Sequence, residues 1–294
     1  MTQLATSSND SVAASPGILV SLVVGTLGRT AELEKLFGSL VHQDHKNFEV
    51  IVVDQNSDDR LGYLFSREWP FRLRRLHTPG VRGVCRGRNT GWRACEGELV
   101  IFPDDDCWYP PCFLSRGIEL MSSSKADILT GRAANEAGHD INGRYSKVPQ
   151  SINRSNVWTS GIEWMMLFRK SALLAVDGFD ETIGVGAATP WQACEAQDII
   201  LRALARGLQC TFDPSFYGHH KEFDISTQSK GRAYGRGLGY VLRIHKYGKF
   251  AEAMWVCRPI VKIGLSVLKG DLRECSYLLD VSLGRLEGCL GRTL

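Results

Sequence analysis

The amino-acid sequence predicts an α/β fold, a mostly parallel sheet flanked by helices, with a helical C-terminal extension. Three short apolar runs, 18–24, 49–53 and 98–102, show no alternation of polar and apolar residues. Such runs are typical of strands that are buried on both faces of a sheet. Segments with helical spacing separate the runs, which favours a parallel sheet with helical crossovers.

A polar N-terminal segment precedes the first predicted strand. Residues 1–16 are small and polar and are expected to form a flexible tail. The strand at 18–24 leads to Thr30, the expected cap of a helix whose apolar residues recur from Leu33 to Val41. The second strand ends at Asp54, and a short helix is expected from Asn89 to Cys95. Residues 17–225 would then form one sheet domain and residues 226–294 a helical C-terminal region.

Composition narrows the class of protein. The 294 residues are 44% hydrophobic and 23% charged, which is typical of a globular protein. A formal net charge of +3 is too small to indicate a nucleic-acid-binding protein. Nine scattered cysteines without metal-type spacing favour a reducing compartment. Neither a secretory signal nor an apolar run long enough to span a bilayer is present, so a cytoplasmic protein is expected.

Carboxylates follow two of the three predicted strands. Asp54 ends the second strand, and Asp104, Asp105 and Asp106 follow the third. Ligands of such sheets bind outside the carboxyl ends of the strands. Three consecutive carboxylates repel one another. A solvated surface turn could tolerate them, but directly after a buried strand a bound divalent cation explains them better. Oxygen ligands favour Mg²⁺ or Mn²⁺ over zinc.

The order of several motifs carries a family resemblance. Over about residues 17–220 the chain resembles the GT-A glycosyltransferases of family 2. The first motif is an apolar strand, a Thr and a helix followed by E-V-I-V-V-D, and the second is G-x-x-x-x-R-N-x-G from Gly83 to Gly91. Then come G-E-L-V-I-F, the acidic run with Pro110, the segment G-F-D-E at 178–181, and Glu195, Asp198 and Arg202.

The resemblance implies an inverting transferase that uses a nucleotide-diphosphate sugar, with UDP as the expected nucleotide. A divalent metal would neutralise the departing diphosphate. Aligned on the family's D-x-D, Asp104 and Asp106 are the metal ligands; aligned on the following Pro, Asp105 is the ligand. The residues expected to bind the nucleotide-sugar are Thr26, Arg29, Asp54, Arg88, Asp104 and Asp105. Arg88 is also compatible with a buried structural ion pair.

Inversion requires one general base that takes the proton of the acceptor hydroxyl. Residues 195–206 are predicted to be helical, between Pro190 and Gly207, which puts Glu195, Asp198 and Arg202 on one face. The common family form has Glu-Asp at the start of this segment, with the Asp as base, but this chain has Ala196 in the place of that Asp. We favour Glu195 as the base and keep Asp198 as the rival, with an ion pair to Arg202 as its alternative role.

Two further groups are candidates for contact with the substrates. His219 and His220 follow a strand predicted at 209–212, and by analogy with several GT-A enzymes one of them would complete the metal site. Trp158 and Trp164 are able to stack on sugar rings, although core packing is the simpler role for their apolar segment.

The C-terminal region is expected to be helical throughout. Gly231, Gly235 and Gly239 recur every four residues, a spacing that allows a neighbouring helix to pack closely. Arg232, Arg236 and Arg243 form a basic stripe, either for phosphates or simply solvated. Residues 255–268 are apolar but short, which indicates an interfacial segment. The last helix carries a stripe of leucines for the domain or a partner subunit: Leu272, Leu279, Leu283, Leu286 and Leu290.

These features lead to the main hypothesis. The chain would transfer sugar to a saccharide or lipid-linked acceptor in cell-surface polysaccharide synthesis, with its C-terminal helices touching the inner face of the membrane. A catalytically impaired protein that only binds nucleotide-sugar, as a scaffold, remains an alternative because of Ala196. A sugar nucleotidyltransferase is a further alternative, although residues 25–30 match its phosphate loop poorly. A dehydrogenase would need G-x-G-x-x-G after the first strand, where this chain has G-T-L-G-R-T.

Overall fold

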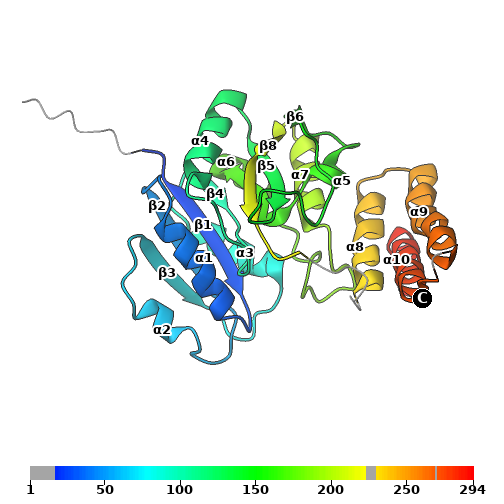
Figure 1. Cartoon of the computed structure of the whole chain (residues 1–294), viewed down its shortest axis with the longest axis horizontal. Helices are drawn as coiled ribbons and strands as arrows, with labels where there is room; N and C mark the ends of the chain where they lie inside the picture. Colours follow the sequence, from blue (N-terminus) through cyan, green and yellow to red (C-terminus); the bar gives the residue numbers. More distant parts are fainter. Residues whose placement is uncertain (1–16, 223–229, 269) are drawn as a thin grey trace, which may run out of the picture.

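A computed structural model describes residues 17–222, 230–268 and 270–294. The tail expected at 1–16 and the boundary expected at 225–226 lie outside these described residues. Within them, a single eight-stranded sheet has the strand order β3-β2-β1-β4-β7-β5-β8-β6 (Figure 1). The strands are β1 (Val20–Thr26), β2 (Phe48–Asp54), β3 (Arg72–His77), β4 (Leu99–Ile101), β5 (Ile128–Ala134), β6 (Gln150–Ser151), β7 (Met166–Arg169) and β8 (Cys210–His219).

The sheet is mixed but mostly parallel, as predicted. Strands β3, β2, β1 and β4 are mutually parallel, and β5 pairs in parallel with β8. The short β7 runs antiparallel to both β4 and β5, and β6 runs antiparallel to β8. The first half of the sheet therefore has its carboxyl ends along one edge.

Helices cover both faces of the sheet, which explains the unbroken apolar runs. Along β1, Leu22 and Val24 join the core on the face of α1 and α4, whereas Val23 joins the core on the face of α3, α6 and α7. Helix α5 and a one-turn 3-10 helix, η1, precede β7. The helices of the sheet domain are α1 (Ala31–Val41), α2 (Gly62–Phe65), α3 (Val84–Ala94), α4 (Phe113–Ser124), α5 (Val157–Ser160), η1 (Glu163–Met165), α6 (Lys170–Val176) and α7 (Glu195–Ala205).

Two local predictions differ from the structure. Helix α3 begins at Val84, five residues before the predicted start, directly after Gly83 with its positive φ of 114°. Gly91 lets this helix approach β1, because a Cβ there would overlap the side chain of Val23. Thr30 precedes α1 as expected, but its side chain makes no capping hydrogen bond.

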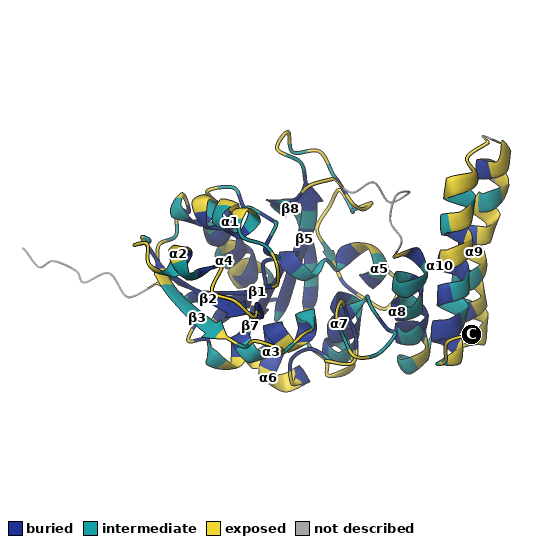
Figure 2. Ribbon diagram, turned by 90° about the horizontal axis from the view of Figure 1, so that it is seen from below, coloured by how far each residue is buried: buried dark blue, intermediate teal, exposed yellow. Residues whose placement is uncertain are grey.

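The C-terminal region consists of α8 (Gly231–Ile244), α9 (Lys249–Leu268) and α10 (Leu272–Leu290). The predicted glycine contact is confirmed: a Cβ at Gly235 or Gly239 would overlap the backbone of α10, and one at Gly284 the backbone of α8. Helix α8 also contributes Val241 to the core of the sheet domain, so it joins that domain to the other two helices. In Figures 1 and 2, α9 and α10 form the end of the molecule farthest from β3.

Pro259 lies inside α9 and leaves the carbonyl of Trp255 without its helical donor. The guanidinium of Arg285 in α10 supplies a replacement, with Nη1 donating to that carbonyl at 2.7 Å. Helix α9 is thus continuous across its proline because α10 completes its hydrogen bonding.

This packing assigns partners to two arginines of the basic stripe and leaves part of the leucine stripe exposed. Arg232 and Arg236 are partly exposed, but both pair with the buried carboxylate of Glu287 in α10. Helix α10 packs on α8 through its glycine face, so its leucine stripe turns outward, with Leu272, Leu279 and Leu290 exposed. Within the described residues no helix is long and apolar enough to cross a membrane.

Candidate active site

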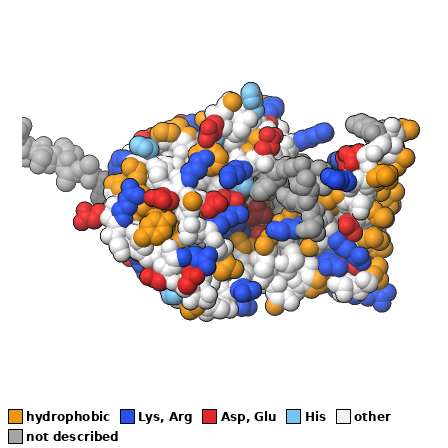
Figure 3. Space-filling model, turned by 60° about the horizontal axis from the view of Figure 1, so that its bottom comes forward, with side chains coloured by type: hydrophobic (Ala, Val, Ile, Leu, Met, Phe, Trp, Pro, Cys, Tyr) orange, Lys and Arg blue, Asp and Glu red, His pale blue; other side chains and the backbone are white. Residues whose placement is uncertain are grey.

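The strand order β2-β1-β4 brings the predicted site residues to one edge of the sheet. Thr26, the last residue of β1, lies opposite Asp54 in the register of the sheet. Its Oγ1 donates to Asp105 Oδ2 at 2.7 Å. Asp54 and the acidic run, 50 residues apart in the chain, therefore flank one threonine. Charged side chains of both signs gather on this side of the molecule in Figure 3.

Arg29 binds two members of the acidic run. Its Nη1 lies 2.6 Å from Asp105 Oδ1 and 2.6 Å from Asp106 Oδ2. Burial raises the pKa of Asp105 to about 6, although Arg29 and Thr26 act in the opposite direction. Asp105 is thus no exposed loop carboxylate but a buried acid that positions Arg29, one of the predicted nucleotide-sugar ligands.

Asp106 and His220 form the pair best suited to a metal ion. Nε2 of His220 lies 3.0 Å from Asp106 Oδ1. Burial lowers the pKa of His220, but the hydrogen bonds to Asp106 and to the carbonyl of Lys221, together with the charges of Asp106 and Asp104, raise it, and the net shift is upward. His219 points elsewhere: its Nδ1 faces the carbonyls of residues 134 and 135, and its ring stacks on Trp108.

The donor set fits a divalent cation only in part. A carboxylate and an imidazole are suitable ligands for Mn²⁺ or Mg²⁺. Among the described residues, however, no three His, Cys, Asp or Glu side chains are gathered closely enough to hold a metal ion. A cation here would complete its coordination with oxygens from a bound ligand and water.

Arg88 connects the acidic run to α7. It is buried, and it donates from Nη2 to Asp104 Oδ1 at 3.0 Å and from Nη1 to Glu195 Oε1 at 3.4 Å. Burial lowers the pKa of Arg88, but the charges of Asp104 and Glu195 raise it. The net shift is upward, so the guanidinium stays charged. The structure thus shows the buried ion pair considered from the sequence, and it makes Arg88 the link between Asp104 and the candidate base.

Glu195 sits at the first turn of α7 in an excess of negative charge. Burial raises its pKa more than Arg88 lowers it. Glu163, in η1, lies within electrostatic range of Glu195, Arg88 and Asp104, and burial together with the charge of Glu195 raises the pKa of Glu163 to about 8. A carboxylate with a raised pKa is suited to accept a proton near neutral pH.

Asp198, the rival base, is held on both sides. Its Oδ2 accepts from Arg202 Nε at 2.8 Å, and its Oδ1 lies 2.8 Å from His245 Nε2 at the end of α8. Asp198 is buried and joins α7 to the C-terminal helices. Its contacts are those of the structural ion pair that was the alternative for this residue.

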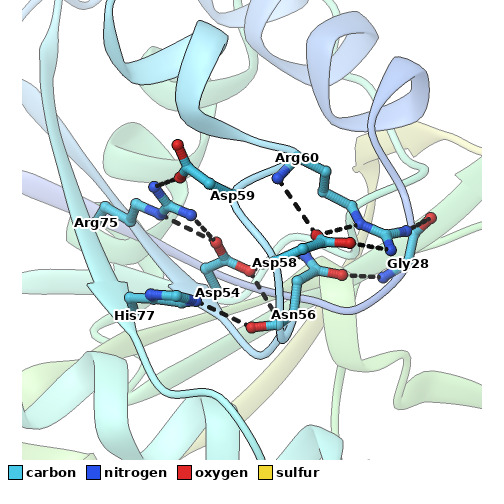
Figure 4. A network of polar contacts seen from close by, with 8 residues as sticks. All are labelled: Gly28, Asp54, Asn56, Asp58, Asp59, Arg60, Arg75 and His77. Carbon is cyan, nitrogen blue, oxygen red and sulfur yellow. Dashed lines mark hydrogen bonds and ion pairs between the residues drawn. The ribbon is translucent and has the colours of Figure 1, made fainter.

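Asp54 lies in a dense polar network (Figure 4). It is fully buried, with Oδ1 accepting from the backbone and side chain of Asn56 and Oδ2 accepting from Nε and Nη2 of Arg75. Asn56 in turn accepts from the backbone N–H of Gly28. Four accepted hydrogen bonds occupy the lone-pair directions of a carboxylate. Asp54 therefore shapes the loops after β1 and β2. The base of a bound nucleotide would have to displace one of these partners to reach the Asp54 carboxylate.

Three residues of this site were not anticipated from the sequence. Arg75 is one of three arginines in β3, and only the pairing of β2 with β3 singles it out. Asn56 follows Asp54 in a turn-rich segment without a motif. Glu163 had a usable signal, since it is the only carboxylate in the apolar stretch 158–168.

The two tryptophans considered for sugar stacking belong to the packing. Trp164 is buried in the core, with its ring near Tyr109 and His220. Trp158 packs against Tyr247 and Trp255 and so joins α5 to α9.

Known proteins resemble this chain in both sequence and fold. The model of the glycosyl transferase family 2 matches residues 21–179, which is more than half of the chain. An uncharacterised glycosyltransferase of Haemophilus influenzae is 37% identical over 93 residues, which is 31% of each chain. Glycosyltransferase AglE of Haloferax volcanii is 24% identical over 284 residues, 90% of this chain and 85% of AglE. A Campylobacter jejuni protein named GalNAc(5)-diNAcBac-PP-undecaprenol beta-1,3-glucosyltransferase is 25% identical over 58% of each chain.

Solved structures share the fold over nearly the whole length. TarS 1–349 of S. aureus in complex with UDP-GlcNAc aligns with a TM-score of 0.58 at 15% identity, over 94% of this chain and 93% of TarS 1–349. The mannosyltransferase PcManGT from Pyrobaculum calidifontis, in complex with GDP-Man and Mn²⁺, aligns with a TM-score of 0.65 at 14% identity, over 94% of this chain and 90% of PcManGT. These similarities confirm the predicted GT-A fold.

Proposed function

Because the chain belongs to glycosyl transferase family 2, we propose that it transfers a sugar from a nucleoside-diphosphate donor to an acceptor hydroxyl with inversion at the anomeric carbon. The observation that carries the proposal is the convergence of Thr26, Arg29 and Arg88 on the acidic run, with Glu195 bound to the same Arg88. It puts cationic groups for a diphosphate beside a carboxylate whose pKa is raised.

The donor would bind at the edge where β1, β2 and β4 end. Arg29 is half-exposed and bridges Asp105 and Asp106, so it is able to turn toward phosphate oxygens. We propose UDP as the nucleotide, which is supported by the UDP-GlcNAc complex of TarS. Asp54 would contribute to binding of the nucleotide base through the loop that it organises with Asn56 and Gly28.

Asp106 and His220 would hold the divalent metal, Mn²⁺ or Mg²⁺, once the diphosphate supplies further oxygens. The Mn²⁺ and GDP-Man complex of PcManGT supports a metal in this family. When bound, such an ion neutralises charge that develops on the departing diphosphate. Asp104 and Asp105 remain within reach of the donor, but in this structure they pair with Arg88 and Arg29.

Glu195 would serve as the general base. The ionised carboxylate takes the proton of the acceptor hydroxyl, the oxygen bonds to the anomeric carbon, and the bond to the diphosphate breaks with its electron pair on the leaving oxygen. Arg88 orients Glu195 by its hydrogen bond and keeps Asp104 close to the donor side. Glu163 would adjust the proton affinity of the same pocket, since both carboxyls are influenced by the one guanidinium.

The acceptor would be a saccharide on a lipid carrier in the synthesis of a cell-surface polysaccharide. Two relatives support this choice by their names: the C. jejuni glucosyltransferase above, and WfaP of Escherichia coli, named for a GlcNAc-diphosphoundecaprenol acceptor. Both names describe transfer of glucose, which supports a hexose as the transferred sugar, whereas the UDP-GlcNAc complex of TarS supports an N-acetylhexosamine.

Thermal stabilisation by nucleotide-sugars tests the donor site. A ligand that binds only the folded protein raises the melting temperature. UDP-sugars should stabilise the protein, and more so with Mn²⁺. Asp106→Asn should abolish the additional effect of Mn²⁺ while retaining the melting temperature of the unliganded protein. Equal stabilisation of wild type and Asp106→Asn by UDP-sugar with Mn²⁺ would contradict the proposed metal site.

A nucleotide-sugar-binding scaffold is the second candidate, and one observation favours it. Ala196 occupies the place of the family's common base, and it is completely buried in α7. Turnover distinguishes the two functions. A scaffold binds the UDP-sugar but neither transfers nor slowly hydrolyses it, whereas the transferase releases UDP in a Glu195-dependent manner.

A further inference from the structure

Helix α9 carries an apolar face that is exposed in the part of the chain that the structure describes. Six residues at helical spacing form this stripe: Phe250, Met254, Cys257, Val261, Gly264 and Leu268. All six are exposed, with Phe250 at 80%, Val261 at 75% and Leu268 at 84% relative exposure. From Phe250 to Leu268 the stripe is about 27 Å long, at a rise of about 1.5 Å per residue. Figure 2 shows this outer side of α9 as exposed.

The opposite side of α9 is already used. Glu252, Pro259 and Ser266 are buried on it, and Ser266 Oγ donates to Glu274 of α10 at 2.7 Å. Ser282 of α10 donates to the carbonyl of Val256 at 2.6 Å. Helix α9 is therefore fixed in rotation by α10, and the apolar stripe cannot turn inward without breaking these contacts.

The exposed charges of α9 have one sign. Among its described residues the exposed charged side chains are Lys249, Arg258 and Lys262, whereas its one carboxylate, Glu252, is buried and paired with Lys249. The outward leucines of α10, Leu272, Leu279 and Leu290, add apolar surface to the same end of the molecule. Figure 3 shows apolar side chains along the edge that the C-terminal helices form.

We propose that α9 is an in-plane membrane-docking helix, whose apolar stripe inserts into the headgroup region of an anionic bilayer while Arg258 and Lys262 contact the lipid phosphates. A helix with an apolar face and only basic exposed charges has the amphipathic character of such interfacial helices. An anionic surface matches the charge of the helix, which an uncharged protein surface would not. The proposal does not depend on the transferase reaction, because it concerns the face of α9 and not the acidic run.

Vesicle flotation tests the proposal with the full chain. The wild type should float with vesicles of phosphatidylcholine and phosphatidylglycerol and remain unbound with phosphatidylcholine alone. Val261→Glu combined with Leu268→Glu should weaken binding by about tenfold or more, because two apolar side chains that would insert into the bilayer are lost. The control is Leu174→Glu, at another exposed leucine, in α6, with 63% relative exposure, which should bind as the wild type does.

A second variant tests the charges separately. Arg258→Glu with Lys262→Glu should weaken binding about fivefold or more for each residue, and high salt should weaken the wild type in the same way. An unchanged melting temperature, with and without UDP-sugar, shows that each variant is folded.

Three results would overturn the proposal. The first is wild-type protein that does not float, or that floats equally with both vesicle compositions. The second is a Val261→Glu, Leu268→Glu variant that floats as the wild type does. The third is a wild-type dimer that this variant converts to monomers, which would assign the stripe to a second copy of the chain.

Discussion

Two regions of the molecule bury carboxylates against arginines, and they do so in opposite proportions. In the C-terminal helices one carboxylate, Glu287, lies between Arg232 and Arg236. At the candidate active site one guanidinium, Arg88, lies between Asp104 and Glu195, with Glu163 close by. Burial acts in the same direction on every carboxyl, so the proportion of arginines to acids decides the outcome.

The pKa values differ accordingly. Burial would raise the pKa of Glu287, but hydrogen bonds from two arginines lower it to about 2. Burial raises the pKa of Glu195, and a single shared arginine does not reverse the shift. The first arrangement holds helices together, and the second keeps a carboxyl ready to exchange a proton. Glu287 with Arg232 and Arg236 is called the structural cluster below, and Glu195 with Arg88, Asp104 and Glu163 the candidate-site cluster.

The largest expected effect is on turnover. Glu195→Gln removes the proton acceptor but keeps the shape and one hydrogen-bond acceptor for Arg88. We expect kcat to fall by about 100-fold or more, with little change in donor affinity, because a general base acts in the transition state. Steady-state transfer assays and calorimetry with UDP-sugar measure the two quantities.

Asp198→Asn is the matched control for Glu195→Gln. It lies one turn later on α7 and should lower the melting temperature, because Arg202 and His245 lose a buried charged partner, while kcat of the folded enzyme stays unchanged. An active Glu195→Gln together with an inactive, folded Asp198→Asn would reverse the assignment of the base.

The pH profile sharpens the same contrast. As the proposed general base, Glu195 would act only when ionised. Its pKa is raised, so kcat/KM should rise with pH about tenfold per unit up to an apparent pKa above the ordinary glutamate value of about 4.3. Rates from pH 4 to 9 check this. Glu195→Asp should keep the acid limb at a lower rate. An acid limb below about pH 4.3 would show that this buried carboxyl does not control the rate.

The structural cluster should respond in stability instead. Glu287→Gln should lower the free energy of unfolding by about 2 kcal/mol at pH 7, less than for a fully buried pair because both arginines reach solvent. The pKa of Glu287 is lowered on folding, so its contribution is complete above the unfolded value of about 4.3 and is lost as pH falls toward 2. Denaturant unfolding at several pH values should show the two proteins converging in acid.

Donor binding provides the control for Glu287→Gln. The variant should bind UDP-sugar as the wild type does, because Glu287 contacts α8 and the chain end and not the acidic run. A loss of donor affinity in folded Glu287→Gln would mean that the two clusters are coupled.

The smallest expected effect is on stability, when the residues that precede the first turns of α10 and α1 are replaced. Asp271 caps α10 by accepting from the backbone N–H of Glu274 at 2.9 Å, whereas Thr30 makes no such bond at α1. Asp271→Ala should therefore cost about 1 kcal/mol of stability and Thr30→Ala less than about 0.5 kcal/mol. Thermal unfolding of both variants measures the difference, and equal losses would contradict the observed cap geometry.

By itself, the sequence predicted the fold class and the strands β1, β2, β4 and β8, but not β3, β5, β6 or β7. Unbroken apolar runs required strands covered on both faces, and the carboxylates at their ends, with the motif order, predicted the GT-A fold and the gathering of Thr26, Asp54 and 104–106. The glycine spacing in α8 predicted close helix packing. Each of these depends on local periodicity or on strand direction, which residues near in the chain encode.

Only the tertiary structure decided which charges meet. Arg88 and Glu195 are 107 positions apart, Asp198 and His245 47, and Arg232 and Glu287 55. Whether a carboxyl faces one arginine or two depends on how α7, α8 and α10 pack, and spacing within one helix does not contain that information. The same packing turned the leucines of α10 and the apolar stripe of α9 outward, because the glycine faces and the contacts of Ser266 and Ser282 occupied the inner side.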